Sequence, residues 1–225
     1  MSATIVFDLD GTLVDTAGDL VATLNLVFQR EGVPPVDLHT SRAMIGGGVK
    51  PLIERGLKAH GRTLAPPDLD RFYAEYLEHY AAHIADLSRP FPGLVDALDR
   101  LAGRGCHFAV CTNKLEWLSL RLLQALGLAD RFATICGQDT FGVKKPDGEV
   151  LRRTIARAGG RLERAVMVGD SATDVATARA AGVPVVAVTF GYTDIPATEL
   201  GADRVISHFA ELFDTVQELV PAPAA

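Results

Sequence analysis

The stretch TIVFDLDGTLVD, residues 4–15, joins a short apolar run to two aspartates and a glycine. Thr4 to Phe7 predicts a buried β-strand, and the Asp-Leu-Asp-Gly-Thr segment that follows predicts a turn. Asp8 and Asp10 are therefore expected at the carboxyl end of a strand. In open parallel sheets, this end faces the crevice in which ligands bind.

Further strand-like runs and helical segments alternate along the second half of the chain. The runs are residues 107–111, 133–136, 165–168 and 184–189, with 203–206 as a candidate for a last short strand. The helical segments are residues 118–126, 150–158, 173–181 and about 209–219. Strand, helix, strand order predicts a parallel sheet covered on both faces. The expected fold class is α/β, with a doubly wound parallel sheet.

A different periodicity separates the first strand from the others. From Asp19 to about Asp86 the apolar residues recur at helical spacing, and proline pairs at 34–35 and 66–67 divide the block into separate helices. We expect residues 16–82 to form a helical domain. It would be inserted into an α/β core domain made of residues 1–15 and 83–225.

Composition and charge argue against several kinds of partner. The 225-residue chain has a net charge of −6 and no basic cluster, so we expect no nucleic-acid partner. No stretch approaches roughly 18 uninterrupted apolar residues, so we expect no membrane partner. The start of the chain lacks a signal-like segment, and its three cysteines favour reduced thiols over a disulfide framework. We expect a soluble, cytoplasmic protein, and the sequence makes no prediction of its oligomeric state.

Polar side chains occur where four strands of the predicted sheet should end. They are Asp8 and Asp10, Thr112 and Asn113, Lys145, and Asp170 and Asp174. Each group taken alone is typical of an ordinary turn or helix cap. Because the carboxyl ends of parallel strands meet at one edge of a sheet, we expect all four groups to converge on one site.

These segments resemble the four motifs of the haloacid dehalogenase superfamily, which match here as DLDGTLVD, TN, KP and GDSATD. The resemblance implies that Asp8 is a phosphorylated nucleophile, Asp10 a general acid and base, and Lys145 a charge stabiliser. It also implies that Thr112 and Asn113 donate hydrogen bonds to the substrate phosphate. The helical block is similar to the cap that this superfamily inserts after its first strand, where substrate choice normally lies.

A magnesium site is expected beside the nucleophile. Mg²⁺ prefers hard oxygen ligands and keeps several waters, so few protein ligands are needed. The resemblance implies Asp170 as a ligand, and Asp8 and the Asp10 carbonyl are the other candidates. Asp174 follows Asp170 by one helical turn, so it either binds the metal through water or orients Lys145.

The expected reaction is hydrolysis of a small phosphate monoester through an aspartyl-phosphate. The strings TNK, KKPDGEVL and GDSATDVATARAAGVPVVAVTFGY most resemble phosphoglycolate phosphatases, which implies 2-phosphoglycolate as the substrate and glycolate and phosphate as products. Other small esters, such as a sugar phosphate, or pyrophosphate remain alternatives, as does a sugar phosphomutase. A dehalogenase is disfavoured because that branch lacks the second aspartate, which is present here as Asp10.

Two alternatives from other classes have specific points against them. A signalling receiver domain shares the doubly wound fold, but its phosphorylated aspartate lies on a later strand and it has no helical insertion. A phosphate-binding protein without catalysis would usually have lost one of the motif residues, and none is missing here. Glu75, His79 and His83 have the spacing of a zinc face, but a solvated helix face produces the same spacing often.

Overall fold

The computed structural model describes residues 3–220, and its centre is a six-stranded parallel sheet in the order β5-β4-β1-β6-β7-β8. The strands are β1 (Thr4–Phe7), β4 (His107–Cys111), β5 (Thr134–Cys136), β6 (Ala165–Gly169), β7 (Val185–Val188) and β8 (Arg204–Ile206). All six were predicted, within one residue at each end. The α/β fold class is confirmed.

Alternate residues of each strand enter two separate cores, because both faces of the sheet are covered. On β1, Ile5 and Phe7 face one core and Val6 faces the other. The first face is covered by α5 (Leu94–Ala102), α6 (Glu116–Ala125) and α9 (Leu212–Leu219), and the second by α7 (Gly148–Arg157) and α8 (Ala172–Ala181). Burial on both sides explains why these strands are continuous apolar runs.

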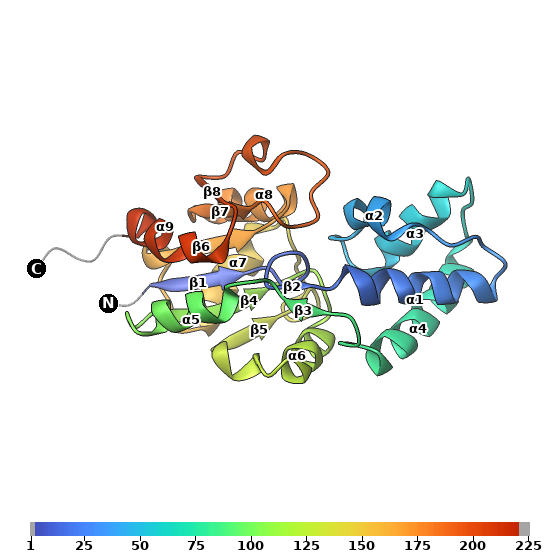
Figure 1. Cartoon of the computed structure of the whole chain (residues 1–225), viewed down its shortest axis with the longest axis horizontal. Coiled ribbons are helices and arrows are strands. Elements are labelled where there is room, and N and C mark those ends of the chain that lie inside the picture. The colour runs from blue at the N-terminus through green and yellow to red at the C-terminus, as the bar shows by residue number, and fades with distance from the viewer. Residues whose placement is uncertain (1–2, 221–225) are drawn as a thin grey trace, which may run out of the picture.

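Four helices form a separate unit beyond one end of the sheet (Figure 1). They are α1 (Ala17–Arg30), α2 (Leu38–Ser41), α3 (Val49–Ala59) and α4 (Pro66–Ala82). Proline is accommodated at the start of α4 because the first helical N–H groups need no partner within the helix. The rings of Phe72, Tyr76 and Tyr80 on α4 are buried, and the Tyr76 hydroxyl donates to the Leu20 carbonyl of α1 at 2.9 Å.

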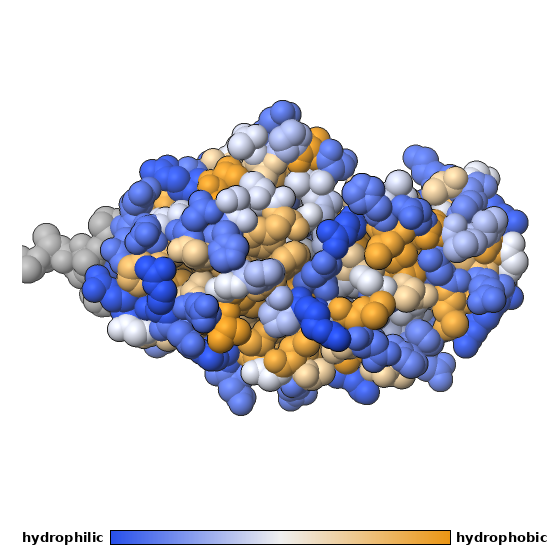
Figure 2. Space-filling model, in the orientation of Figure 1, coloured by the Kyte–Doolittle hydropathy of each residue, from blue (hydrophilic) through white to orange (hydrophobic). Residues whose placement is uncertain are grey.

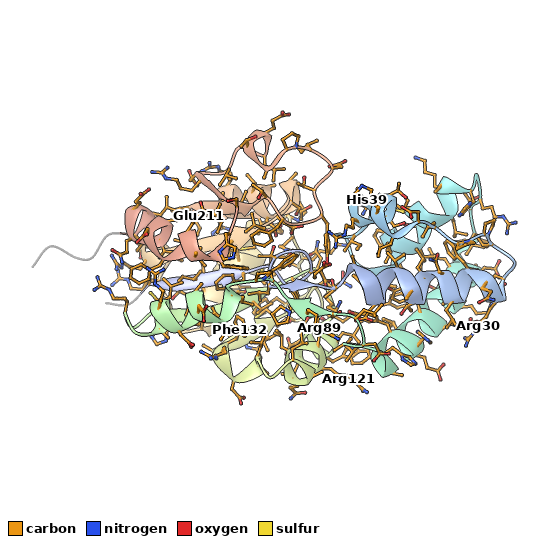
Figure 3. The ribbon with its side chains drawn as sticks, viewed as in Figure 1. Arg30, His39, Arg89, Arg121, Phe132 and Glu211 are labelled. Carbon is orange, nitrogen blue, oxygen red and sulfur yellow. The ribbon has the colours of Figure 1, made fainter. Side chains whose placement is uncertain are left out.

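A pair of two-residue strands joins the two parts of the molecule. The strands β2 (Val14–Asp15) and β3 (Arg89–Pro90) pair in antiparallel fashion, so the chain leaves the sheet and returns to it side by side. In Figure 3, Arg89 lies between the helical unit, which carries Arg30 and His39, and the α/β part, which carries Phe132 and Glu211. The sequence did not predict these two strands.

The outer surface is mixed in polarity. Figure 2 shows hydrophilic residues along the outline of both parts, with separate apolar patches between them. Among the described residues, none of the helices combines the length and the hydropathy that a bilayer-spanning segment requires.

Candidate active site

The predicted site residues converge at the carboxyl ends of the central strands. Asp8 follows β1, Thr112 and Asn113 follow β4, and Asp170 follows β6. Because β1 lies between β4 and β6, these residues surround the point at which the connections diverge to the two sides of the sheet. Lys145 reaches the same place from the loop before α7.

Asp8, Lys145 and Asp174 form a buried charge cluster. The Lys145 Nζ lies 2.9 Å from Asp8 Oδ1 and donates to Asp174 Oδ1 at 2.6 Å. Burial alone would lower the pKa of Lys145, but the Asp174 and Asp8 carboxylates outweigh it and raise that pKa. Lys145 is therefore a permanent cation beside the nucleophile predicted from sequence.

The Asp8 carboxyl has an unusually high proton affinity. Burial raises its pKa to about 6, and the negative charge of Asp174 adds to this, although Lys145 acts in the opposite direction. Burial also raises the pKa of Asp170 to about 8, with further contributions from Asp174 and Asp8. Carboxylates that repel one another in this way gain stability from a bound cation.

The Asp170 carboxylate accepts hydrogen bonds from the segment after β1 and from the loop after β7. Its Oδ1 accepts from the Thr12 hydroxyl at 3.1 Å, and its Oδ2 accepts from the Tyr192 N–H at 2.7 Å. Gly11 has a φ of 82°, and a Cβ there would lie 2.5 Å from Asp170 Oδ2. The glycine of the Asp-Leu-Asp-Gly-Thr turn thus leaves room for the Asp170 carboxylate.

The residues at this point fit a small hard cation. Asp8, Asp170 and Asp174 each offer one carboxylate oxygen, and these three oxygens lie within 4.8 Å of one another. All three side chains are buried, which is costly for grouped carboxylates unless cations balance them. A donor set made only of oxygens matches the preference of Mg²⁺.

Asp10 faces a different part of the site. Its Oδ1 accepts from the Thr16 hydroxyl at 2.8 Å, and the Lys114 Nζ donates to its Oδ1 and Oδ2 at 3.0 and 3.2 Å. The Asp10 carboxylate is not part of the three-aspartate cluster. The turn after β1 therefore gives the two aspartates of this segment different surroundings.

Thr112 and Asn113 line the same pocket as Asp8. The Asn113 Nδ2 donates to the Lys145 carbonyl at 3.3 Å, and its Oδ1 is buried without a hydrogen-bond partner among residues 3–220. A buried amide with unused hydrogen-bonding capacity at the mouth of a site is suited to a polar ligand.

The pocket itself lies between the sheet and the helical unit. The helical unit contributes an apolar and glycine-rich wall, made of Leu20, Ile45, Gly46, Gly48, Val49 and Leu52. The sheet side contributes the polar residues described above, together with Lys114, Ser171 and Thr173. The reactive polar groups of the pocket thus come from the sheet, and the apolar residues that limit its shape come from the helical unit.

Tyr192 connects the aspartate cluster to the start of the helical unit. Besides the bond from its N–H to Asp170, its hydroxyl accepts from the N–H groups of Thr16 and Ala17 at 2.6 and 2.9 Å. The same hydroxyl donates to Asp15 Oδ1 at 2.7 Å. The segment where the chain enters α1 is therefore fixed to the loop that follows β7.

Sequence analysis did not assign several residues of the site, among them Lys114, Thr12 and Tyr192. Lys114 directly follows Thr112 and Asn113, and its place in that motif was an available signal. Thr12 was available in the same way, since it closes the turn that begins at Asp8. Tyr192 had no local signal, because the bonds of its hydroxyl join residues 175 or more positions apart.

Comparison with known proteins agrees with this geometry. The haloacid dehalogenase-like hydrolase family matches the chain over residues 5–188. A phosphoglycolate phosphatase from Mesorhizobium japonicum is 49% identical over 92% of both chains, and one from Agrobacterium fabrum is 43% identical over 100% of this chain and 97% of its own.

Solved structures give the same result. A predicted phosphoglycolate phosphatase from Haemophilus somnus superposes with a TM-score of 0.89 at 27% identity, covering 96% of this chain and 98% of that one. The structure of CbbY from Rhodobacter sphaeroides in complex with phosphate has a TM-score of 0.78 at 28% identity, covering 94% and 96%.

The fold, the converging carboxylates and these matches define a hydrolase that acts on phosphoric monoesters. The chain belongs to the haloacid dehalogenase-like hydrolases. Its assignment as a phosphatase agrees with the prediction from sequence.

Proposed function

We propose that this phosphatase acts on 2-phosphoglycolate and releases glycolate and inorganic phosphate. The observation that carries the proposal is the pocket in which Asp8, Lys145 and Thr112 face the apolar and glycine-rich wall of the helical unit. That wall offers no polar side chain, so it favours a short leaving group over a sugar, whose hydroxyl groups would lose hydrogen bonds to water there. The name shared by the relatives at 43% and 49% identity supports the same substrate.

In the proposed reaction a carboxylate oxygen of Asp8 attacks the phosphorus atom, and the bond from phosphorus to the leaving-group oxygen breaks. Asp10 gives a proton to that oxygen, so the alcohol leaves without charge. A water molecule then attacks the aspartyl-phosphate while Asp10 takes its proton, and the bond from Asp8 to phosphorus breaks. Inorganic phosphate leaves, and both aspartates return to their starting states.

The remaining residues stabilise charge during phosphoryl transfer. The ammonium of Lys145 and the donor groups of Thr112 and Asn113 would bind the phosphate oxygens, where negative charge accumulates. We propose that Asp174 orients Lys145, because its Oδ1 accepts from Lys145 at 2.6 Å and its Oδ2 is bound by Ser171.

Mg²⁺ is the proposed cofactor. Asp8, the Asp10 backbone carbonyl and Asp170 would hold it, with Asp174 close enough to bind through a water molecule. When bound, the ion supplies positive charge that lets an anionic nucleophile and a phosphate approach each other.

We propose that residues 16–82 act as a cap over a core made of residues 1–15 and 83–225. The residues between β2 and β3 provide the apolar and glycine-rich wall of the pocket, which supports this division. We also propose that the protein works in the cytoplasm, because Cys106, Cys111 and Cys136 are all unpaired.

A panel of phosphate monoesters with Mg²⁺ present tests the substrate. We expect the highest kcat/KM with 2-phosphoglycolate, against glucose 6-phosphate, ribose 5-phosphate and pyrophosphate. A hexose phosphate that exceeded it by tenfold, about 1.4 kcal/mol in transition-state binding, would contradict the assignment and leave only a phosphatase. Conversion of a sugar phosphate to its isomer, without free phosphate, would instead support a phosphomutase.

A further inference from the structure

Lys114 is a second buried cation in the pocket, and the proposed reaction gives it no part. It follows β4 and lines the cavity, and its side chain is 4% exposed. Lys145 has both Asp8 and Asp174 within 2.9 Å. Lys114 has only one carboxylate partner among the described residues, Asp10.

The surroundings of Lys114 leave it able to bind another anion. An ammonium group has three N–H donors, and Asp10 accepts from it at 3.0 and 3.2 Å. On its other side lies the ring of Tyr80 from α4, whose centroid is 4.5 Å from the Lys114 Nζ. A ring face attracts a cation without using a donor, so one N–H remains for a ligand in the pocket.

The position of Lys114 relates it to the leaving group rather than to the phosphate. A leaving-group oxygen bound to Asp10 at about 2.8 Å would lie within about 6 Å of the Lys114 Nζ, which is 3.0 Å from Asp10 Oδ1. A carboxylate on the carbon that bears the ester oxygen can therefore reach the Lys114 Nζ.

The opposite wall has no side chain that would bind a charged or hydroxylated leaving group. It consists of Leu20, Ile45, Gly46, Gly48, Val49 and Leu52. Sugar hydroxyl groups buried against these residues would lose hydrogen bonds to water without replacement. A short leaving group with one anionic end avoids that penalty, because its charge meets Lys114.

We propose that Lys114 is a specificity-determining residue that binds a carboxylate on the leaving group. The substrate class is then short phosphate monoesters with a carboxylate next to the ester carbon. The inference rests on the proposed function, since it assumes that Asp10 faces the leaving group during catalysis.

The test compares 2-phosphoglycolate with ethyl phosphate, which has the same two-carbon length and lacks the carboxylate. The quantity measured is the ratio of the two kcat/KM values. Lys114→Met also removes a partner of Asp10, but this loss affects both substrates and cancels in the ratio. We expect Lys114→Met to lower the ratio by about 10- to 100-fold, the range for a hydrogen bond to a charged group.

Two further variants make the result specific. Lys58→Met removes an exposed lysine of α3 outside the pocket and should leave the ratio unchanged. Lys114→Gln keeps a hydrogen-bond donor for Asp10 but removes the charge, so it should lower the ratio of the two kcat/KM values by the same amount. It takes the place of Lys114→Met if that variant does not fold. An unchanged ratio in whichever uncharged variant folds would overturn the proposal and leave Lys114 as a residue that only positions Asp10.

The wild-type rates separate this proposal from the proposed function. Hydrolysis of ethyl phosphate at least as efficient as that of 2-phosphoglycolate would overturn carboxylate recognition while the phosphatase activity stood. Failure to hydrolyse either ester, or any other monoester with Mg²⁺, would overturn the proposed function itself.

Discussion

Single residues in this site act through charge balance more than through shape. Three buried carboxylates lie within 4.8 Å of one another at their closest oxygens, and Lys145 is the cation that contacts two of them. Without Lys145, Asp8 and Asp174 would be buried anions with no positive partner in their cluster. The stability and the activity of the protein should both depend on this one side chain.

We predict that Lys145→Met lowers kcat/KM by roughly 10² to 10³ and destabilises the metal-free protein by about 3–5 kcal/mol, the range for a broken buried ion pair. Mg²⁺ should restore part of the stability, because it supplies charge to the same carboxylates. Thermal unfolding with chelator and with Mg²⁺, together with steady-state rates, measures both effects.

The neighbouring lysine provides a matched control for this prediction. Lys144 is exposed, so Lys144→Met should leave the rate and the unfolding temperature close to those of the wild type. If the two variants behaved alike, the charge balance described here would not be what makes Lys145 important.

At the residue scale, the sequence predicts what is local and misses what is not. Asp8, Asp10, Thr112 and Asn113 directly follow buried strands, and parallel pairing alone brings such positions together. Lys114 was missed although it directly follows Thr112 and Asn113, because its place in that motif does not reveal its contact with Asp10.

At the scale of elements, the hydroxyl of Tyr192 fixes the start of α1. It accepts from the N–H groups of Thr16 and Ala17, which have no partner within the helix because they open it. It also donates to Asp15, whose other oxygen pairs with Arg42 of the helical unit at 2.6 Å. Burial raises the pKa of the Tyr192 hydroxyl well above its usual range, so it stays neutral and able to donate.

We predict that Tyr192→Phe destabilises the protein by about 1–3 kcal/mol, because the Thr16 N–H loses its acceptor and the Ala17 N–H keeps only a long bond to Asp15 Oδ1 at 3.4 Å. It should also lower kcat/KM, since the helical unit that closes the pocket would be less well placed. Tyr73→Phe on α4 is the matched control, because it removes a hydroxyl from a partly exposed ring of the same unit. Equal unfolding temperatures and rates for both variants would show that Tyr192 does not order this connection.

Sequence analysis missed two very short strands and one helix. The strands β2 and β3 have two residues each, too few to show alternation, and α5 was not predicted although Leu94, Leu98 and Leu101 share its buried face.

The glycine at the start of α7, Gly148, is explained by packing against α8 and not by local sequence. A Cβ there would lie 2.5 Å from the Ala180 backbone of α8, a clash that no local pattern indicates.

At the scale of the whole molecule, the raised carboxyl pKa values link stability to pH. Burial raises the pKa of Asp8 to about 6 and of Asp170 to about 8. The folded protein therefore holds more protons than the unfolded chain, whose aspartates titrate at about 3.9. This contribution to stability is complete below about pH 4 and is lost as the pH rises through about 6 and then about 8.

We predict that replacing Asp170 with asparagine removes the upper part of this pH dependence. In the presence of chelator, the unfolding free energy of the wild type should fall relative to Asp170→Asn as the pH rises from about 6 to about 9. Mg²⁺ should protect the wild type more at the higher pH, since metal ligands must lose their protons. A difference that stayed constant or grew in favour of the wild type would contradict the raised pKa.

The central claim is that Asp8 is the nucleophile and Asp10 the proton carrier, and intact-mass analysis after rapid acid quench tests it most directly. The wild type, Asp8→Asn and Asp10→Asn are mixed with p-nitrophenyl phosphate, whose leaving group needs no protonation, and with an alkyl phosphate, whose leaving group does.

We expect no phosphate adduct on Asp8→Asn with either substrate, because the attacking carboxylate is absent. Asp10→Asn should gain the adduct quickly with p-nitrophenyl phosphate and slowly with the alkyl ester. It should then hydrolyse the adduct roughly 10² to 10⁴ times more slowly than the wild type, since no base activates the water. A phosphate adduct on Asp8→Asn, or equal behaviour of the two variants with both esters, would contradict the account.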